Sequence, residues 1–195
     1  MAATFRFSAS DHAYYAGARR LPSITQILAA TADGGVCPFY TEETAARGTR
    51  IHQATARFDL GAGWGQDLLL TDVPRVRAYA AFLQMSHPVY AEIEQPRWSK
   101  RYGFAGTPDR VGHWADGRAF VLDIKTGGPL DDHALQTAAQ VLVLDAKPES
   151  HLRYTLHLRD DETYRLLPYK DAQDFPRFLA RLATYTQGGH HGIDG

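Results

Sequence analysis

The chain of 195 residues is long enough to bury a hydrophobic core as one domain, and its 44% hydrophobic and 22% charged residues are typical of a soluble globular protein. The formal net charge of −1 excludes an overall basic surface, so any contact with nucleic acid must come from a local patch. The single cysteine, Cys37, excludes an internal disulfide, a cysteine-ligated zinc and a four-cysteine iron–sulfur cluster.

The first half of the chain predicts one hairpin and three helices. Spaced aromatic residues at positions 4–16 favour a short hairpin or an ordered arm. Amphipathic periodicity and N-capping residues, Ser23 and Thr41 among them, predict helices at residues 21–28, 41–60 and 73–86. The loop at residues 61–72 is either a site of substrate contact or a plain connection.

The second predicted helix carries a glycine and a histidine on one side. Gly48 and His52 are four positions apart, so they face the same way on a helix. A glycine inside a helix costs about 1 kcal/mol relative to alanine, which indicates that it permits the close approach of another backbone, a phosphate or a metal site. The alternative is a surface histidine beside an incidental glycine.

A strand is expected at residues 89–94, with Glu92 and Glu94 on one face. The hairpin tip that follows interleaves cations with Trp98 and Tyr102, a composition that can hold phosphates and stack unpaired bases. An ordinary solvated turn is the alternative. The candidate nucleic-acid-binding residues of this tip are Arg97, Lys100 and Arg101.

The clearest chemical signal is a predicted pair of strands within residues 103–127, joined by an Asp-Gly turn. Asp109 lies near the first strand, while Asp123 and Lys125 end the second strand on one face, with Ile124 on the other. Paired carboxylates suit Mg²⁺ or Mn²⁺, and a lysine beside them can orient a water molecule and offset charge on a phosphoryl group.

Arg110, next to Asp109, either pairs with an acid or reaches a phosphate. After the second strand, a helix capped by Asp131 or Asp132 is expected to extend to about residue 145. Gln136 and Gln140 share one face of this helix, and plain solvent exposure is the alternative to a role in a site. Two further strands and a final helix complete the expected fold, at residues 151–158, 163–168 and 171–186.

Pro108-Asp109, followed 14 positions later (123 − 109) by Asp123-Ile124-Lys125, resembles the signature of the PD-(D/E)XK nuclease superfamily. Three other segments are similar to its RecB-like, phage-type exonuclease group, namely PSITQIL near the N-terminus, RGTRIH around His52 and the helix with Gln136. The family often has a tyrosine where this chain has Gln140. The resemblance covers most of the chain and implies an α/β (α+β) fold with a restriction-endonuclease-like core, a central mixed sheet flanked by helices.

The resemblance also implies roles for individual residues. Asp109, Asp123 and Lys125 are the expected catalytic residues, with Lys125 positioning the water. One or two Mg²⁺ or Mn²⁺ ions would be held by His52, Asp109, Asp123 and the carbonyl of Ile124. Glu94, in competition with Glu92, and Gln136 are expected auxiliary residues, and DNA contacts are expected from Arg97, Lys100, Arg101 and Arg110.

The function implied is a Mg²⁺- or Mn²⁺-dependent deoxyribonuclease, foremost an exonuclease of DNA processing or recombination, phage-encoded or cellular. DNA is the expected partner; a homo-oligomer and a single-strand-annealing or recombination partner protein are further expectations. The alternatives are a structure-specific endonuclease, a catalytically silent DNA-binding or assembly module on the same fold, and a small-molecule enzyme with a coincidental motif. The iron–sulfur cluster of CRISPR-adaptation relatives is not expected, because Cys37 stands alone.

The location and domain limits follow from composition. The N-terminal residues lack the apolar segment of a signal peptide, and no run of about 18 apolar residues could span a membrane. We therefore expect a cytoplasmic protein without membrane contact, in the host cytoplasm if a phage encodes it. Residues 1–187 are expected to form the nuclease domain and residues 188–195 a flexible C-terminal tail.

Overall fold

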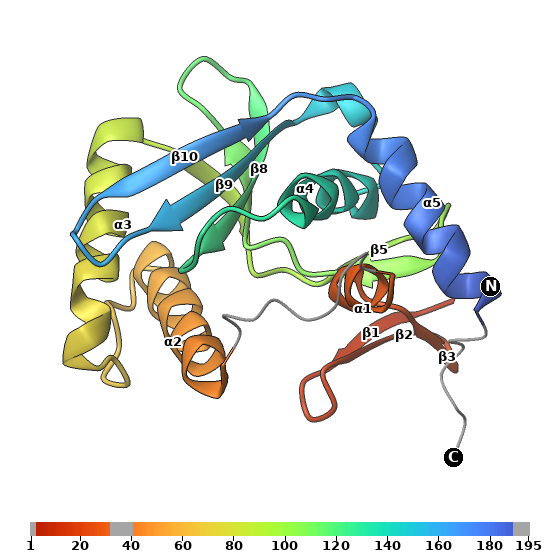
Figure 1. Ribbon diagram of the computed structural model, residues 1–195, viewed down its shortest axis with the longest axis horizontal. Coiled ribbons are helices and arrows are strands. Elements are labelled where there is room, and N and C mark those ends of the chain that lie inside the picture. The colour runs from red at the N-terminus through yellow and green to blue at the C-terminus, as the bar shows by residue number, and fades with distance from the viewer. Residues whose placement is uncertain (1–2, 32–40, 189–195) are drawn as a thin grey trace.

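The computed structural model describes residues 3–31 and 41–188. Its centre is a five-stranded mixed sheet in the order β10-β9-β8-β7-β4, with β8 and β9 parallel and the other neighbours antiparallel (Figure 1). The strands are β4 (Val89–Ile93), β7 (Arg110–His113), β8 (Ala119–Lys125), β9 (Leu152–Leu158) and β10 (Tyr164–Tyr169). This arrangement confirms the predicted fold class.

Helices cover both faces of the sheet. Helices α2 (Glu42–Asp59) and α3 (Val73–Ser86) pack on one face, and α4 (Asp132–Val143) and α5 (Asp174–Gln187) belong to the layer on the other. Strand β8 is therefore apolar on both sides: Phe120, Leu122 and Ile124 face α2 and α3, whereas Val121 faces α4 and α5. Helix α4 is the crossover that parallel strands β8 and β9 require.

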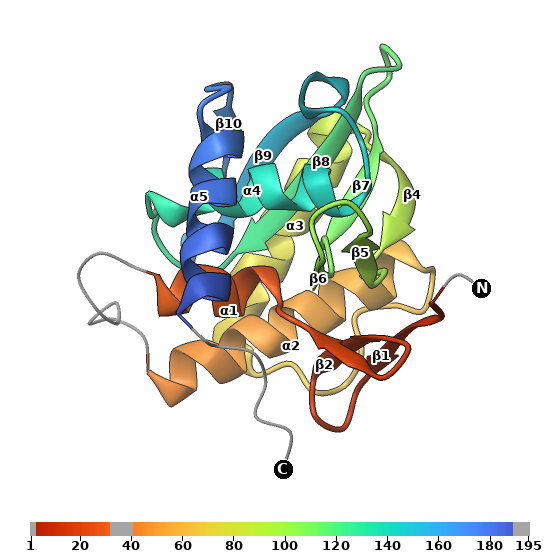
Figure 2. The ribbon, with the colours of Figure 1, turned by 90° about the vertical axis from the view of Figure 1, so that its right-hand side faces the viewer.

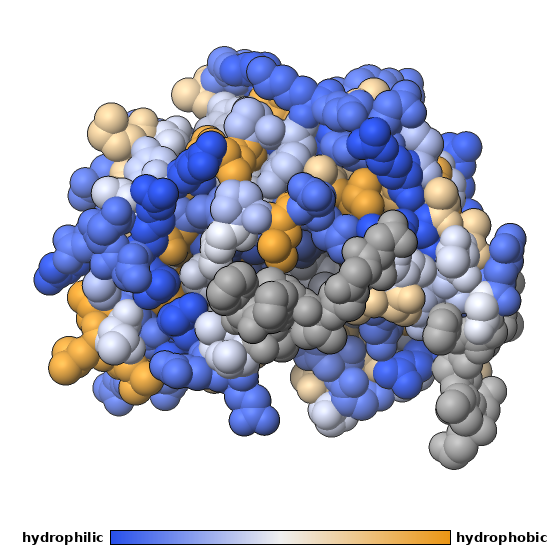
Figure 3. All heavy atoms as spheres, in the orientation of Figure 1, coloured by the Kyte–Doolittle hydropathy of each residue, from blue (hydrophilic) through white to orange (hydrophobic). Residues whose placement is uncertain are grey.

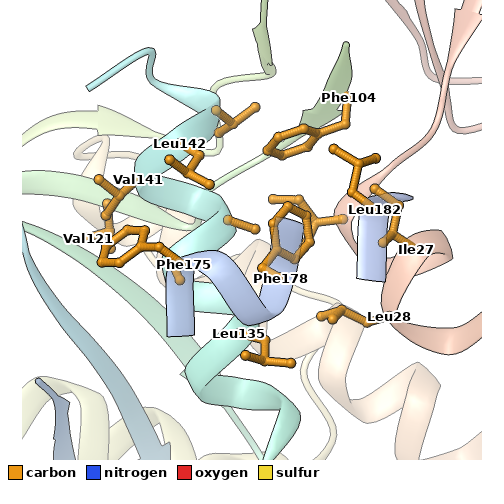
Figure 4. Packing of buried hydrophobic residues seen from close by; sticks show 14 of the residues in the cluster. Ile27, Leu28, Phe104, Val121, Leu135, Val141, Leu142, Phe175, Phe178 and Leu182 are labelled. Atoms are coloured by element: carbon orange, nitrogen blue, oxygen red, sulfur yellow. The ribbon is translucent and has the colours of Figure 1, made fainter. Parts of the chain in front are cut away.

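The core between α4, α5 and α1 (Ile24–Ala30) is closely packed (Figure 4). Phe104 meets Phe178 with ring centroids 5.0 Å apart and planes at 60°. The sequence predicted that the last helix begins at Asp171, but α5 begins at Asp174. The carboxylate of Asp171 instead accepts from the backbone N–H of Gln173, and the resulting turn delays the helix.

The N-terminal residues form more than the expected hairpin. Strands β1 (Phe5–Ser8), β2 (Ala13–Ala16) and β3 (Arg19–Leu21) make a three-stranded antiparallel sheet, and β5 (Arg97–Ser99) pairs with β6 (Phe104–Gly106). Figure 2 shows β1 and β2 below β5 and β6. Phe5 stacks on Trp98 at 6.0 Å, so the aromatic residues of the arm join the two small sheets.

The predicted caps are present. Ser23 and Thr41 each accept from a backbone N–H of the first helical turn, at the starts of α1 and α2. In the loop between α2 and α3, Trp64 stacks on Phe58, with ring centroids 3.9 Å apart, and substrate contact by this loop stays a prediction. It ends in the short 3₁₀ helix η1 (Leu70–Asp72), and a second one, η2 (Pro148–Ser150), precedes β9. Figure 3 shows apolar side chains at the lower left, near the start of α3, where Leu70 is 91% exposed.

Some sequence predictions lie outside the described residues. Cys37 does, and so does the tail except for Gly188, the C-cap residue of α5. Within residues 3–31 and 41–188, none of the helices has both the length and the apolar character needed to cross a bilayer.

Candidate active site

Three side chains from three parts of the fold meet near the end of β8. His52 belongs to α2, Glu94 follows β4, and Asp109 precedes β7. The Nδ1 atom of His52 lies 3.4 Å from Oδ2 of Asp109 and 3.6 Å from Oε1 of Glu94. One ligand atom from each residue lies within 4.8 Å of the others, a spacing that can hold a metal ion. This group is called the metal trio below.

The choice between Glu92 and Glu94 is decided by the backbone. The pairing of β4 with β7 shifts register between Tyr90 and Glu92, but this shift precedes both acids and does not separate them. Glu94 then takes a left-handed φ of +49°, and its N–H donates to the carbonyl of Asp109 at 3.0 Å. As a result Glu94 joins the metal trio, whereas Glu92 pairs with Arg97.

The metal trio is strongly coupled electrostatically. Burial lowers the pKa of His52, but the carboxylates of Asp109 and Glu94 outweigh it and raise this pKa to about 10. Burial raises the pKa of Asp109, yet His52 outweighs it and holds the value below normal. Burial raises the pKa of Glu94. Protonated His52 thus balances two carboxylates that would otherwise repel each other.

Asp123 and Lys125 lie beside the metal trio on the α4 face of β8, as alternation predicted. Nζ of Lys125 is 2.6 Å from Oδ2 of Asp123 and donates to Oε1 of Gln136 at 2.9 Å. Gln136 and Gln140 both donate to Oδ1 of Asp123, at 2.9 and 2.7 Å. Gln140 is only 2% exposed, so solvent exposure is wrong for it, and it binds Asp123 from the position where the family often has tyrosine.

Asp123 is not part of the metal trio. Its Oδ1 receives two amide donors and its Oδ2 faces Lys125, while burial raises its pKa. Asp123 and Asp109 nevertheless line the same cavity of about 400 Å³. Ile124 contributes its backbone N–H, which donates to Oδ2 of Asp109 at 2.6 Å. The metal-binding roles of Asp123 and of the Ile124 carbonyl stay predictions.

A larger cavity of about 1170 Å³ adjoins this site and shares His52, Glu94 and Lys125 with it. Its walls include the first half of α2 and the loop of residues 126–130 that follows β8. A Cβ atom added to Gly48 would meet only Oγ1 of Thr126, at 3.8 Å. No atom of the described residues therefore comes close enough to require a glycine here, and the close approach of a phosphate or a metal inferred from the sequence stays a prediction.

The structure brings further residues to the site that the sequence did not indicate. The hydroxyl groups of Tyr14 and Thr107 are hydrogen-bonded at 2.8 Å, and both residues line the cavity of 400 Å³. His12, at a left-handed φ of +51°, lines both cavities. Thr107 could have been indicated only by its place in the Gly-Thr-Pro-Asp stretch that ends at Asp109. Tyr14 could not have been indicated, because its contact with Thr107 joins distant parts of the chain.

The DNA-binding role expected for Arg110 needs correction. Arg110 is fully buried, its Nε donates to Oδ2 of Asp59 at 2.6 Å, and its Nη1 donates to the carbonyl of Asp109 at 2.7 Å. Nη1 also lies 3.4 Å from Oε1 of Glu94. A guanidinium without exposed surface cannot reach a phosphate, so Arg110 supports the backbone of Asp109 and the carboxylate of Glu94.

The other candidate DNA contacts are not gathered at the site. Arg97 pairs with Glu92, and the guanidinium of Arg101 lies over the ring of Tyr102, 5.1 Å from its centroid. Neither they nor the exposed Lys100 line the two cavities. Because Trp98 stacks on Phe5, its ring serves packing. DNA binding by Arg97, Lys100 and Arg101 stays a prediction.

Two buried histidines fix the loop of residues 126–130. His133 accepts from the N–H of Leu130 through Nδ1 at 3.2 Å, and Nδ1 of His157 lies 2.8 Å from the carbonyl of Gly127. Burial lowers the pKa of both, to about 3 for His133. Both side chains are therefore neutral at pH 7, as the acceptor role of His133 requires.

This burial predicts a loss of stability in acid. The unfolded chain binds a proton at His133 below about pH 6.5, whereas the folded chain excludes it until about pH 3. The stability that neutral His133 contributes is therefore complete above pH 6.5. The free energy of unfolding should fall by about 2 kcal/mol between pH 7 and pH 5 because of this histidine. Urea unfolding of His133→Gln at both values should show a correspondingly smaller pH dependence. Exposed His113→Gln is the control, and an unchanged pH dependence in His133→Gln would contradict the assignment.

The overall fold is similar to three solved structures. An alkaline exonuclease, LHK-Exo from Laribacter hongkongensis, has 12% sequence identity and a TM-score of 0.49, with 86% of this chain and 87% of that chain covered. LHK-Exo in complex with dAMP has 13% identity and a TM-score of 0.41, covering 87% and 94%. The structure of SSO0001 has 16% identity and a TM-score of 0.40, covering 72% and 73%.

No protein-family model matches the chain, and no curated protein does. Because the TM-scores of the similar structures are below 0.5, the function has to be inferred from the site itself. The fold expected from the resemblance to PD-(D/E)XK nucleases is confirmed, with Asp109 beside β7 and Asp123 and Lys125 on the adjacent strand β8.

Proposed function

We propose that the protein is a divalent-metal-dependent nuclease that hydrolyses phosphodiester bonds in DNA, and that it acts as an exonuclease. The observation that carries this proposal is the metal trio of His52, Glu94 and Asp109 beside the Asp123–Lys125 ion pair, where two cavities share lining residues. The exonuclease assignment is supported by the RecB-like segments of the sequence.

The donor set of the metal trio fits Mg²⁺ or Mn²⁺. Two carboxylates are hard oxygen ligands for either ion, and the imidazole of His52 is a suitable additional ligand for Mn²⁺. The carboxylates of Asp109 and Glu94 raise the pKa of His52, so they favour a positive charge at this position. One or two ions held by the trio, with Asp123 and the Ile124 carbonyl as further expected ligands, would supply Lewis-acid chemistry to water and to the phosphoryl oxygens.

The neighbouring residues supply orientation and charge. Asp123 and Gln136 hold the ammonium of Lys125, which we assign to positioning the attacking water and to offsetting negative charge on the phosphoryl group. In the hydrolysis, a bond forms between the water oxygen and phosphorus, the bond to the leaving oxygen breaks, and the leaving oxygen takes a proton. Gln136 and Gln140 fix the Asp123 carboxylate and thereby the position of Lys125.

The biological setting belongs to the same proposal. DNA processing or recombination in a cytoplasm, that of a host if a phage encodes the protein, is consistent with a small nuclease domain. A homo-oligomer and a recombination partner protein stay predictions.

Digestion of three DNA substrates tests the proposal. End-labelled linear duplex, end-labelled single-stranded DNA and a covalently closed circle are incubated with Mg²⁺, Mn²⁺ or EDTA, with Asp123→Ala as the inactive control. We expect metal-dependent loss of linear DNA while the circle is spared, with the polarity given by the label. Nicking of the circle would indicate an endonuclease, and DNA binding without cleavage under any metal would indicate a silent binding module.

A further inference from the structure

A third cavity, of about 440 Å³, lies on the other side of the loop that follows Lys125. Residues 126–129 line both this cavity and the cavity of 1170 Å³, so the two adjoin at this loop. Helix α3 and the turn between β9 and β10 contribute the opposite walls, and the strands of this turn contact α3 (Figure 1). In Figure 3 hydrophilic side chains cover the left edge, where the turn lies.

Arg75 of α3 lines this cavity with an incompletely paired guanidinium. The residue is 9% exposed, and its Nε is buried without a hydrogen-bond partner. Its ion pair with Asp160 is loose, with Nη2 and Oδ2 3.7 Å apart, and the Asp160 side chain is 80% exposed. A buried cation without full pairing is costly, and an anion in the cavity would remove that cost.

The other charges of the cavity leave room for such an anion. Arg159 and Arg165 add two cations, while Asp160 and Asp161 are the two acids. The carboxylate of Asp161 already accepts from the backbone N–H and the hydroxyl of Thr163. His157 is neutral at pH 7, since burial lowers its pKa. Burial and, next, the charge of Arg47 in the adjacent cavity lower the pKa of Arg75, while the carboxylates of Asp160 and Asp72 act in the opposite direction.

The shared wall can be passed closely by a chain of phosphates. Gly127 and Gly128 have open space where a Cβ atom would stand, with no atom within 4 Å. His157 holds the carbonyl of Gly127 at 2.8 Å from its Nδ1, which fixes the loop against β9. A strand bound in the larger cavity can therefore continue over this glycine pair to Arg75.

We infer that Arg75, with Arg165, forms a phosphate-binding pocket that holds a backbone phosphate of the DNA strand next to the active site. Guanidinium groups suit phosphate oxygens in charge and geometry, and contacts of this kind fix the register of a strand without reading its sequence. This pocket rests on the proposed nuclease function, because DNA is taken as the ligand that fills both cavities.

Binding of a fluorescein-labelled single-stranded oligonucleotide, measured by anisotropy in EDTA at several NaCl concentrations, tests the pocket. Arg75→Gln should weaken binding about tenfold, and the slope of log K against log salt should become shallower by about 0.7, the value for one lost phosphate contact on single-stranded DNA. The matched control is Arg77→Gln, which removes an exposed cation of the same helix outside the cavity. Exposed Arg165→Gln provides a second variant in case Arg75→Gln does not fold.

Competition with inorganic phosphate tests whether the anion that the pocket binds is a phosphate of DNA or free phosphate alone. If the pocket binds a DNA phosphate, millimolar phosphate should compete with the oligonucleotide in the unmodified protein and less in Arg75→Gln. Equal losses in Arg75→Gln and Arg77→Gln, or unchanged DNA affinity in both Arg75→Gln and Arg165→Gln, would overturn the inference. Unchanged affinity in a protein that cleaves DNA would refute only the pocket. Loss of affinity in Arg75→Gln without cleavage by the unmodified protein would support the pocket and refute the nuclease.

Discussion

Replacement of Asp109 with asparagine is expected to lower the rate of metal-dependent DNA cleavage by at least about 10³-fold. The substitution keeps the shape of the side chain but removes one of the two carboxylate charges of the metal trio. The same variant should lose the thermal stabilisation that Mn²⁺ gives to the unmodified protein, which is about 2.7 kcal/mol at a hundred times the Kd. Cleavage of end-labelled linear DNA and melting temperatures with and without Mn²⁺ measure both effects.

Asp116→Asn is the matched control for Asp109→Asn. Asp116 lies in the turn between β7 and β8, where it pairs with Arg118 at an exposed position. The change in charge is the same, yet neither cleavage nor metal binding should change. If Asp109→Asn retained metal-dependent cleavage within about threefold of the unmodified rate, a difference of less than about 1 kcal/mol in activation free energy, Asp109 would not bind the metal.

Strand β8 shows which parts of the site local sequence can predict. Side chains alternate strictly along a strand, so the order Asp123-Ile124-Lys125 was enough to place the acid and the lysine on one face. Apolar neighbours cover this strand on both faces, as the central sheet flanked by helices implied by the resemblance requires. The same holds for the helix starts at Ser23 and Thr41, because a cap is formed within four residues.

Glu94 shows where local pattern fails. Regular alternation puts it on the same face as Glu92, and nothing in residues 89–94 marks the left-handed φ that Glu94 adopts directly after the strand. That conformation accompanies the hydrogen bond that the N–H of Glu94 donates to the carbonyl of Asp109, a residue outside the segment. A choice between two acids two positions apart therefore required the tertiary structure.

The remaining partners of the site are distant in sequence. Gln140 binds Asp123 across 17 positions, Arg110 binds Asp59 across 51, and Tyr14 binds Thr107 across 93. Each pair depends on how a helix or hairpin packs against the sheet, which periodicity does not specify. Gln136 was identified from the resemblance to a nuclease family. It lies close to Lys125 in sequence, and the short connection from β8 to α4 brings the two side chains together.

Replacement of Arg110 with methionine is expected to reduce the free energy of unfolding by about 3–5 kcal/mol. Arg110 is fully buried, and the side chain of Asp59, its partner at 2.6 Å, is 3% exposed. Burial raises the pKa of Asp59, and the positive charge of Arg110 acts in the opposite direction. Removal of the arginine therefore leaves a buried acid without its cation. Urea unfolding at pH 7 measures the loss.

Two further variants separate this role from a general effect of charge. Arg77→Met breaks an exposed ion pair with Glu162 and should cost less than about 1 kcal/mol. The double variant Asp59→Leu, Arg110→Met should recover part of the lost stability, because the unpaired buried acid is gone. A phosphate contact by Arg110 would instead lower DNA affinity and leave stability unchanged. Since Nη1 of Arg110 also faces Glu94 and binds the carbonyl of Asp109, a loss of stability together with weaker Mn²⁺ binding would show that this buried ion pair positions the metal trio.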